Sequence, residues 1–80
     1  MSLSPNQCKA ARALLGWTQE DLHQKSKLAK KTIAAFETGD RSPHPSTLAA
    51  LRTTLEAAGV VFIDDSDVSS EGGAGVRLRK

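Results

Sequence analysis

The stretch LAKKTIAAFETG, residues 28–39, has the pattern of a short amphipathic helix that stops at a glycine. Ile33 and Phe36 stand at helical spacing, which predicts that both face a hydrophobic core. The outer and N-terminal surface of that helix is then formed by Lys30, Lys31, Ala34 and Ala35. The two lysines are either ordinary solvated side chains or side chains that contact another molecule, and this stretch alone leaves both readings open.

A second short helix precedes this one. Thr18 can cap a helix over residues 19–26, where acidic residues in the first turn suit the positive end of the helix dipole. The helix over residues 29–38 follows after a break around Lys27 and Leu28. Two short helices joined so closely predict a helix-turn-helix.

Two further helices flank this pair. Ser4 at a capping position, Pro5 at the first helical position and Gln7 at the third, where its side chain can reach back to the cap, predict a helix. This helix is expected to end at Gly16 and to turn Cys8 inward. A last helix is predicted over residues 45–58, with a buried face formed by Leu48, Leu51, Leu55 and Ala58 at helical spacing.

The composition changes after Gly59. The segment VVFI (60–63) and the segment VRLR (76–79) flank a polar, glycine-rich loop, which predicts two short antiparallel strands. A two-stranded hairpin is marginal alone, so it must pack on the helices or pair with a second subunit. We therefore expect a mainly α fold: a four-helix domain over 1–59 that contains the helix-turn-helix, and a β-hairpin tail over 60–80 that is a candidate dimerisation element.

The length and composition exclude several classes of protein. Eighty residues suffice for one compact domain, and the net charge of +2 is modest. The single cysteine cannot form an internal disulfide, and neither a signal peptide nor an apolar run of membrane-spanning length is visible. We expect a soluble, cytoplasmic protein that does not contact a membrane.

No catalytic or metal-binding pattern is visible in the sequence. His23 and His44 lie in different predicted elements, and Cys8 lies on a helix face that we expect to be buried. The acidic residues of the tail lack the residue order of a calcium loop. We therefore expect no enzyme activity, no cofactor and no metal.

The segments RALLGWTQEDL (12–22) and LAKKTIAAFETGDRSPHPSTLAALRTTLEAAG (28–59) together resemble the Cro and phage-repressor type of helix-turn-helix regulators, the XRE family. The combination of TQxxL, TIxxFExGxRxP and TLxxL is more specific than a bare helix-turn-helix. The resemblance implies a lambda-repressor-like fold, double-stranded DNA as the partner, and the helix over 29–38 as a recognition helix in the major groove.

The resemblance also implies roles for individual residues. Base-edge contacts are expected from Lys30, Lys31 and Ala35. Contacts to the DNA backbone are expected from Gln19, Thr32 and Arg41, and Gln19 should also brace the recognition helix. A structural pair that joins the first helix to the end of the recognition helix is expected from Arg12 and Glu37.

Three residues depart from the family pattern. Lys27 stands where a glycine is usual in the turn, so either a left-handed backbone there is strained or the turn is altered. Ala29 replaces the usual Ser or Thr cap of the recognition helix, which forgoes a bond worth about 1 kcal/mol. Ala35 is too short to hydrogen-bond adenine, although its methyl can meet a thymine methyl.

The resemblance leads us to expect a dimeric repressor that binds an inverted repeat near its own gene. We expect the homodimer interface on the helix over 45–58 or on the strand formed by Val60, Val61, Phe62 and Ile63. Activation through contact with polymerase stays open. The alternative from another class is an antitoxin-like or other interaction protein that binds a second protein through its tail.

Overall fold

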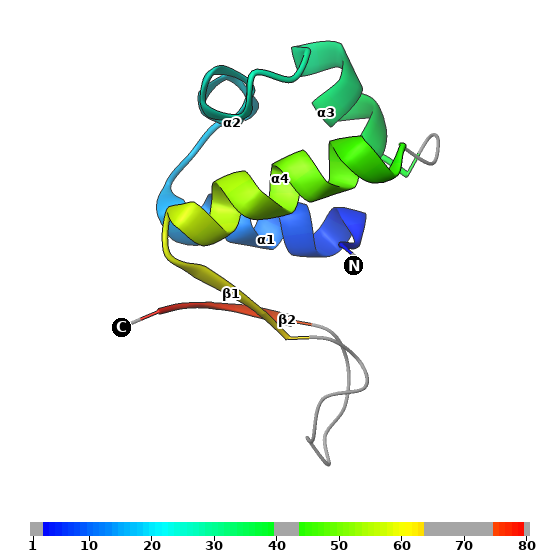
Figure 1. Cartoon of the computed structure of the whole chain (residues 1–80). Coiled ribbons are helices and arrows are strands. Elements are labelled where there is room, and N and C mark those ends of the chain that lie inside the picture. The colour runs from blue at the N-terminus through cyan, green and yellow to red at the C-terminus, as the bar shows by residue number, and fades with distance from the viewer. Residues whose placement is uncertain (1–2, 40–43, 64–74, 80) are drawn as a thin grey trace.

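A computed structural model describes residues 3–39, 44–63 and 75–79 of the chain (Figure 1). The helices and strands, in chain order, are α1 (Pro5–Leu15), α2 (Gln19–Ser26), α3 (Lys30–Glu37), α4 (Pro45–Ala57), β1 (Val60–Ile63) and β2 (Gly75–Leu78). The predicted fold class is confirmed, because the structure is mainly helical and ends in a short antiparallel hairpin. The predicted bounds differ from these by at most one residue at any end.

Reciprocal capping bonds explain where the first two helices begin. The Gln7 N–H donates to Ser4 Oγ, and the Ser4 N–H donates to Gln7 Oε1, both at 3.0 Å. In α2 the Asp21 N–H donates to Thr18 Oγ1 at 3.1 Å, and the Thr18 N–H donates to Asp21 Oδ2 at 2.9 Å. Each pair satisfies N–H groups that a helix start leaves unpaired. As predicted, Ala29 makes no side-chain cap for α3.

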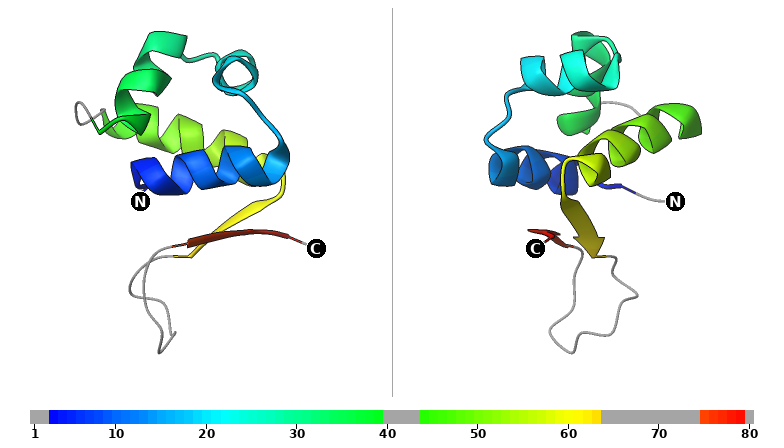
Figure 2. Two further views of the ribbon diagram at one scale, coloured as in Figure 1. Left: turned by 180° about the vertical axis from the view of Figure 1, so that it is seen from behind. Right: turned by 60° about the vertical axis from the view of Figure 1, so that its left-hand side comes forward.

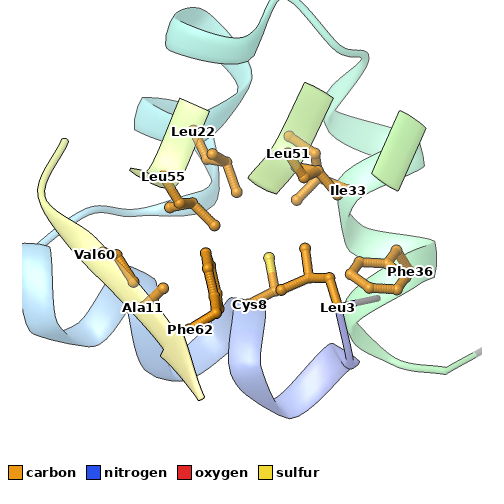
Figure 3. Packing of buried hydrophobic residues seen from close by; sticks show 10 residues of the cluster. All are labelled: Leu3, Cys8, Ala11, Leu22, Ile33, Phe36, Leu51, Leu55, Val60 and Phe62. Atoms are coloured by element: carbon orange, nitrogen blue, oxygen red, sulfur yellow. The ribbon is translucent and has the colours of Figure 1, made fainter. Parts of the chain in front are cut away.

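The helices and the hairpin form one hydrophobic core. In Figures 1 and 2, α1 and α4 cross the middle of the molecule, α2 and α3 lie on one side of them, and the hairpin lies on the other. The core side chains converge between these elements (Figure 3). Its buried hydrophobic residues are Leu3, Cys8, Ala11, Leu22, Ile33, Phe36, Leu51, Leu55, Val60 and Phe62.

The hairpin packs on α1 and α4 through one face. Strands β1 and β2 are antiparallel, with Val60 opposite Leu78 and Phe62 opposite Val76. Val60 and Phe62 are buried in the core of their own chain. We expected β1 to meet a second subunit. Within β1, the parts that stay accessible to a partner are the outer backbone edge and the half-buried side chains of Val61 and Ile63.

Gln7 of α1 holds the two strands together at their far end. Its Nε2 group donates to the carbonyl oxygen of Ile63 at 3.1 Å and to that of Gly75 at 3.2 Å. Its Oε1 atom accepts the Ser4 N–H, so one buried amide both caps α1 and anchors the hairpin. The sequence pattern predicted the cap but not the anchor.

The expected burial of four side chains was wrong. Ala34 and Ala35 were predicted on the outer surface of the recognition helix, but both are half-buried, because α3 is packed on more than one side. Leu48 and Ala58 were predicted to be buried in α4, and both are only half-buried.

Lys27 adopts the left-handed conformation that the turn requires, with φ of 68°. Among the described residues other than glycine, no other has a positive φ. A residue with a side chain pays about 1 to 2 kcal/mol of conformational energy in this region. Glycine avoids this cost but loses more backbone entropy on folding, so a glycine here would gain only part of it.

We expect Lys27→Gly to raise the free energy of unfolding by about 1 kcal/mol in a denaturant titration. Lys9→Gly, within α1, should lower it by about as much. Equal destabilisation by both changes would contradict the strain at Lys27.

Candidate nucleic-acid interface

The first turn of α3 presents three polar side chains to solvent. Lys30, Lys31 and Thr32 are all exposed, and Ala29 before them adds no side-chain cap. The unpaired N–H groups at this end of the helix carry a partial positive charge, and Lys30 and Lys31 add two positively charged side chains to the same turn. The opposite face carries Ile33 and Phe36 into the core, so this turn has a fixed orientation.

The other end of α3 is held by a buried carboxylate. Glu37 is only 3% exposed, and its two oxygens accept four hydrogen bonds. Oε1 accepts from Arg12 Nη2 at 2.7 Å and from Gln19 Nε2 at 2.9 Å. Oε2 accepts from Arg12 Nε at 2.8 Å and from Cys8 Sγ at 3.0 Å. We call these four residues the Glu37 network.

The Glu37 network joins three helices at one point. Arg12 and Cys8 belong to α1, Gln19 is the first residue of α2, and Glu37 is the last residue of α3. Arg12 Nη1 also donates to the carbonyl oxygen of Trp17 in the turn between α1 and α2, at 3.1 Å. The position of α3 relative to α1 and α2 is therefore set by directional bonds as well as by packing.

Burial and hydrogen bonding shift two pKa values in this network. Burial by itself raises the pKa of Glu37, but the hydrogen bonds from Arg12, Cys8 and Gln19 outweigh it and hold the pKa below the ordinary value of 4.5. Burial raises the pKa of the Cys8 thiol well above its ordinary value of 9.0, and the bond to Glu37 raises it further. Glu37 is thus an anion and Cys8 a neutral donor at neutral pH.

Two short contacts hold the turn between α2 and α3. The His23 Nδ1–H group donates to the carbonyl oxygen of Leu28, and the Leu28 N–H donates to Ser26 Oγ at 3.2 Å. With Lys27 in the left-handed region, these bonds bring the first turn of α3 close to α2. His23 and Ser26 therefore support the geometry of the turn.

An acidic side chain lies beside the exposed lysines. Glu20 Oε1 of α2 is 3.4 Å from Lys30 Nζ, and Gln24 Nε2 donates to Glu20 Oε2 at 2.9 Å. The hydrogen bond from Gln24 and the charge of Lys30 lower the pKa of Glu20, so it is ionised at neutral pH. The surface around the first turn of α3 is thus a mixture of two cations and one anion.

The comparison with known families agrees with this geometry. A family model described as helix-turn-helix matches residues 9–56, which is more than half of the chain. The chain belongs to the helix-turn-helix family. This family is typical of XRE and Cro-type regulators, and it binds DNA rather than catalysing a reaction. No curated protein matches the chain.

In this helix-turn-helix protein the expected DNA contacts have different surroundings. Gln19 uses one amide N–H on Glu37, which braces α3 and leaves one N–H for another acceptor. Ala35 is half-buried, and the Thr38 hydroxyl donates to its carbonyl oxygen at 3.0 Å. The expected contact at Arg41 lies outside the described residues.

Cys8 is the member of the Glu37 network that the sequence did not indicate as a polar partner. We predicted a packing role, and the side chain is indeed fully buried in the core. Its position four residues before Arg12 on the same helix face was the available signal, because side chains at that spacing meet the same neighbour.

Other kinds of site are not apparent in the described part of the helix-turn-helix protein. Residues 3–39, 44–63 and 75–79 contain no group of three or more metal-ligating side chains. In the same ranges no helix is both long enough and apolar enough to span a membrane.

The raised pKa of Cys8 predicts a pH dependence of stability. Above about pH 9 the unfolded thiol loses its proton while the native thiol keeps it, so the native state binds more protons and stability falls as the pH rises. Between pH 8 and pH 10 we expect the free energy of unfolding to fall by about 1 kcal/mol more in the native protein than in Cys8→Ala. Denaturant titration at each pH measures this difference. Parallel curves would contradict the burial of a neutral thiol.

Proposed function

We propose that this helix-turn-helix protein is a sequence-specific transcriptional repressor that enters the major groove with the first turn of α3. The observation that carries the proposal is the contrast between the two ends of that helix. One end presents the exposed Lys30 and Lys31, and the other end is tied to α1 and α2 through Glu37. A helix held in this way can offer its first turn to base edges without losing its own packing.

The proposed contacts follow from side-chain chemistry and exposure. Lys30 and Lys31 donate to guanine O6 and N7. Thr32, Arg41 and the remaining N–H of Gln19 donate to phosphate oxygens, which fix the register of the protein on the duplex. Ala35 contributes only its methyl group, which suits a close approach to a thymine methyl.

We propose that the protein binds as a homodimer and that the outer edge of β1 pairs with its symmetry mate. Within the described residues β1 is paired only with β2, so its other edge has backbone groups available for an added strand. The hairpin lies on the other side of α1 and α4 from α3, so a subunit bound there leaves α3 uncovered (Figure 2). Sedimentation of a monomer alone at high micromolar concentration would contradict this interface.

A symmetric dimer would read two half-sites about 34 Å apart, one turn of the double helix. The described residues form one core with no separate ligand-binding unit, so occupancy of the operator is the proposed output. An inverted repeat next to the gene of this protein is the target that fits such a dimer.

Selection of bound sequences from random DNA tests this proposal. We expect one preferred site, and we expect Lys30→Ala and Lys31→Ala each to weaken it about tenfold or more while weakening random DNA less. Lys9→Ala removes the same charge from an exposed position of α1 and should affect both DNAs only slightly.

Two outcomes would count against parts of the proposal. If Lys30→Ala and Lys31→Ala each lose as much affinity for random DNA as for the preferred site, these lysines contact phosphates and not bases. A protein that selects no sequence at all would contradict the repressor and favour an interaction protein that binds a second protein through its tail.

A further inference from the structure

Two neighbouring acids at the start of α2 have different partners. Asp21 turns back to accept the Thr18 N–H at 2.9 Å and so completes the cap of its own helix. Glu20 turns across to α3, where its Oε1 atom lies 3.4 Å from Lys30 Nζ. Asp21 alone makes the capping box, so the Glu20 side chain takes no part in the cap of α2.

The Glu20 carboxylate is oriented but not buried. Gln24 Nε2 holds its second oxygen at 2.9 Å, one helical turn along α2. The side chains of Lys30 and Glu20 are 55% and 47% exposed, and ion pairs this exposed contribute little to folding stability. On a surface that meets phosphates, an anion also weakens attraction to every DNA sequence. An acid in the first turn of α2 suits the helix dipole, but Asp21 already supplies one there, and general DNA affinity does not account for the second acid.

The chemistry of the pair matches one kind of base-pair edge. In the major groove guanine offers two adjacent acceptors, O6 and N7, and its cytosine offers the N4 amino donor beside them. An ammonium can only donate and a carboxylate can only accept. Lys30 over the guanine and Glu20 over the cytosine satisfy all three groups. An A·T pair in the same pose would place the Lys30 ammonium beside the adenine amino group, so that two donors meet. It would also place the Glu20 carboxylate beside thymine O4, so that two acceptors meet.

We propose that Glu20 is a specificity-determining residue that recognises a guanine·cytosine pair together with Lys30. Lys30 donates to the guanine acceptors, and Glu20 accepts from the cytosine amino group. The inference rests on the proposed function, because it requires the first turn of α3 to lie in the major groove. Glu20 then acts mainly by rejecting pairs that present an acceptor where cytosine presents its amino group.

The test compares sequence selection by the native protein and by Glu20→Gln. An amide both donates and accepts, so the variant should tolerate either kind of group opposite residue 20. We expect the preference for G·C at one position of each half-site to fall about tenfold, with the other positions unchanged. The matched control is Glu56→Gln, which removes the same charge from an exposed acid paired with Arg52 at 3.0 Å on α4. This control should leave the selected site as it is.

Three results would overturn the inference. If Glu20→Gln strengthens binding to all sequences equally, Glu20 only repels phosphates, and the proposed function stands without it. If the position that changes in Glu20→Gln prefers adenine, the assignment to guanine·cytosine is wrong. If the native protein selects no sequence, the proposed function fails and this inference fails with it.

Discussion

Replacing Arg12 by methionine is expected to lower the free energy of unfolding by about 3 to 5 kcal/mol, because it leaves the Glu37 carboxylate buried without its cation. The Glu37 side chain is 2% exposed, and Arg12 supplies two of its four hydrogen bonds. Methionine keeps much of the apolar stem of arginine, so the loss reports the charge and the hydrogen bonds more than the packing. Denaturant titration at neutral pH measures it.

The double variant Arg12→Met with Glu37→Gln is the control for this experiment. It removes both charges and leaves a neutral amide that Gln19 and Cys8 can still contact. We expect it to be more stable than Arg12→Met alone, because an unpaired buried charge costs more than the absence of the pair. A loss below about 1 kcal/mol in the single variant would mean that Glu37 finds water or another cation, and that the network does not hold α3.

Loss of this pair should also affect the surface that we propose for DNA binding. The same bonds that stabilise the fold set the orientation of α3, so Arg12→Met should weaken DNA binding even though Lys30 and Lys31 are intact. Thermal unfolding followed in the same samples separates a misplaced α3 from an unfolded protein.

Replacing Gln7 by glutamate is expected to lower the free energy of unfolding by about 2 to 4 kcal/mol. The Gln7 side chain is buried, and its Nε2 group donates to two carbonyl oxygens, one from each strand of the hairpin. A carboxylate has no proton to donate, so it would face the oxygens of Ile63 and Gly75 with like partial charge. The cap of α1 survives, because an oxygen still accepts the Ser4 N–H.

Stability measurements at low pH and amide hydrogen exchange show whether the effect of Gln7→Glu is specific to the hairpin. At pH 3 the protonated glutamic acid regains one O–H donor, so the difference from native protein should shrink. Amide exchange should rise first in β1 and β2 and later in α2 and α3. Gln7→Met is the neutral control and should cost less than the glutamate. Faster exchange confined to α1 would show that the anchor is unimportant and that only the cap was disturbed.

Much of the fold was predictable because its signals are local. The caps at Ser4 and Thr18, the proline at the start of α4 and the apolar spacing of Ile33 and Phe36 act within a few residues of the chain. Local signals of this kind place helix ends to within a residue or two. The resemblance indicated an unusual turn at Lys27, because the family pattern has a glycine there, and the structure decided that the left-handed conformation is kept.

The sequence by itself determined which segments become helices and strands, and it placed Lys30 and Lys31 on the outer surface at the start of α3. Only the tertiary structure decided what the neighbouring polar groups do. Glu20 and Asp21 are adjacent acids in sequence, yet one caps its own helix and the other meets Lys30. Gln7 carries a capping pattern, and its amide also holds a hairpin more than fifty residues away. The physical reason is that helix capping depends on near neighbours in the chain, whereas the partner of a long polar side chain depends on which distant segment folds against it.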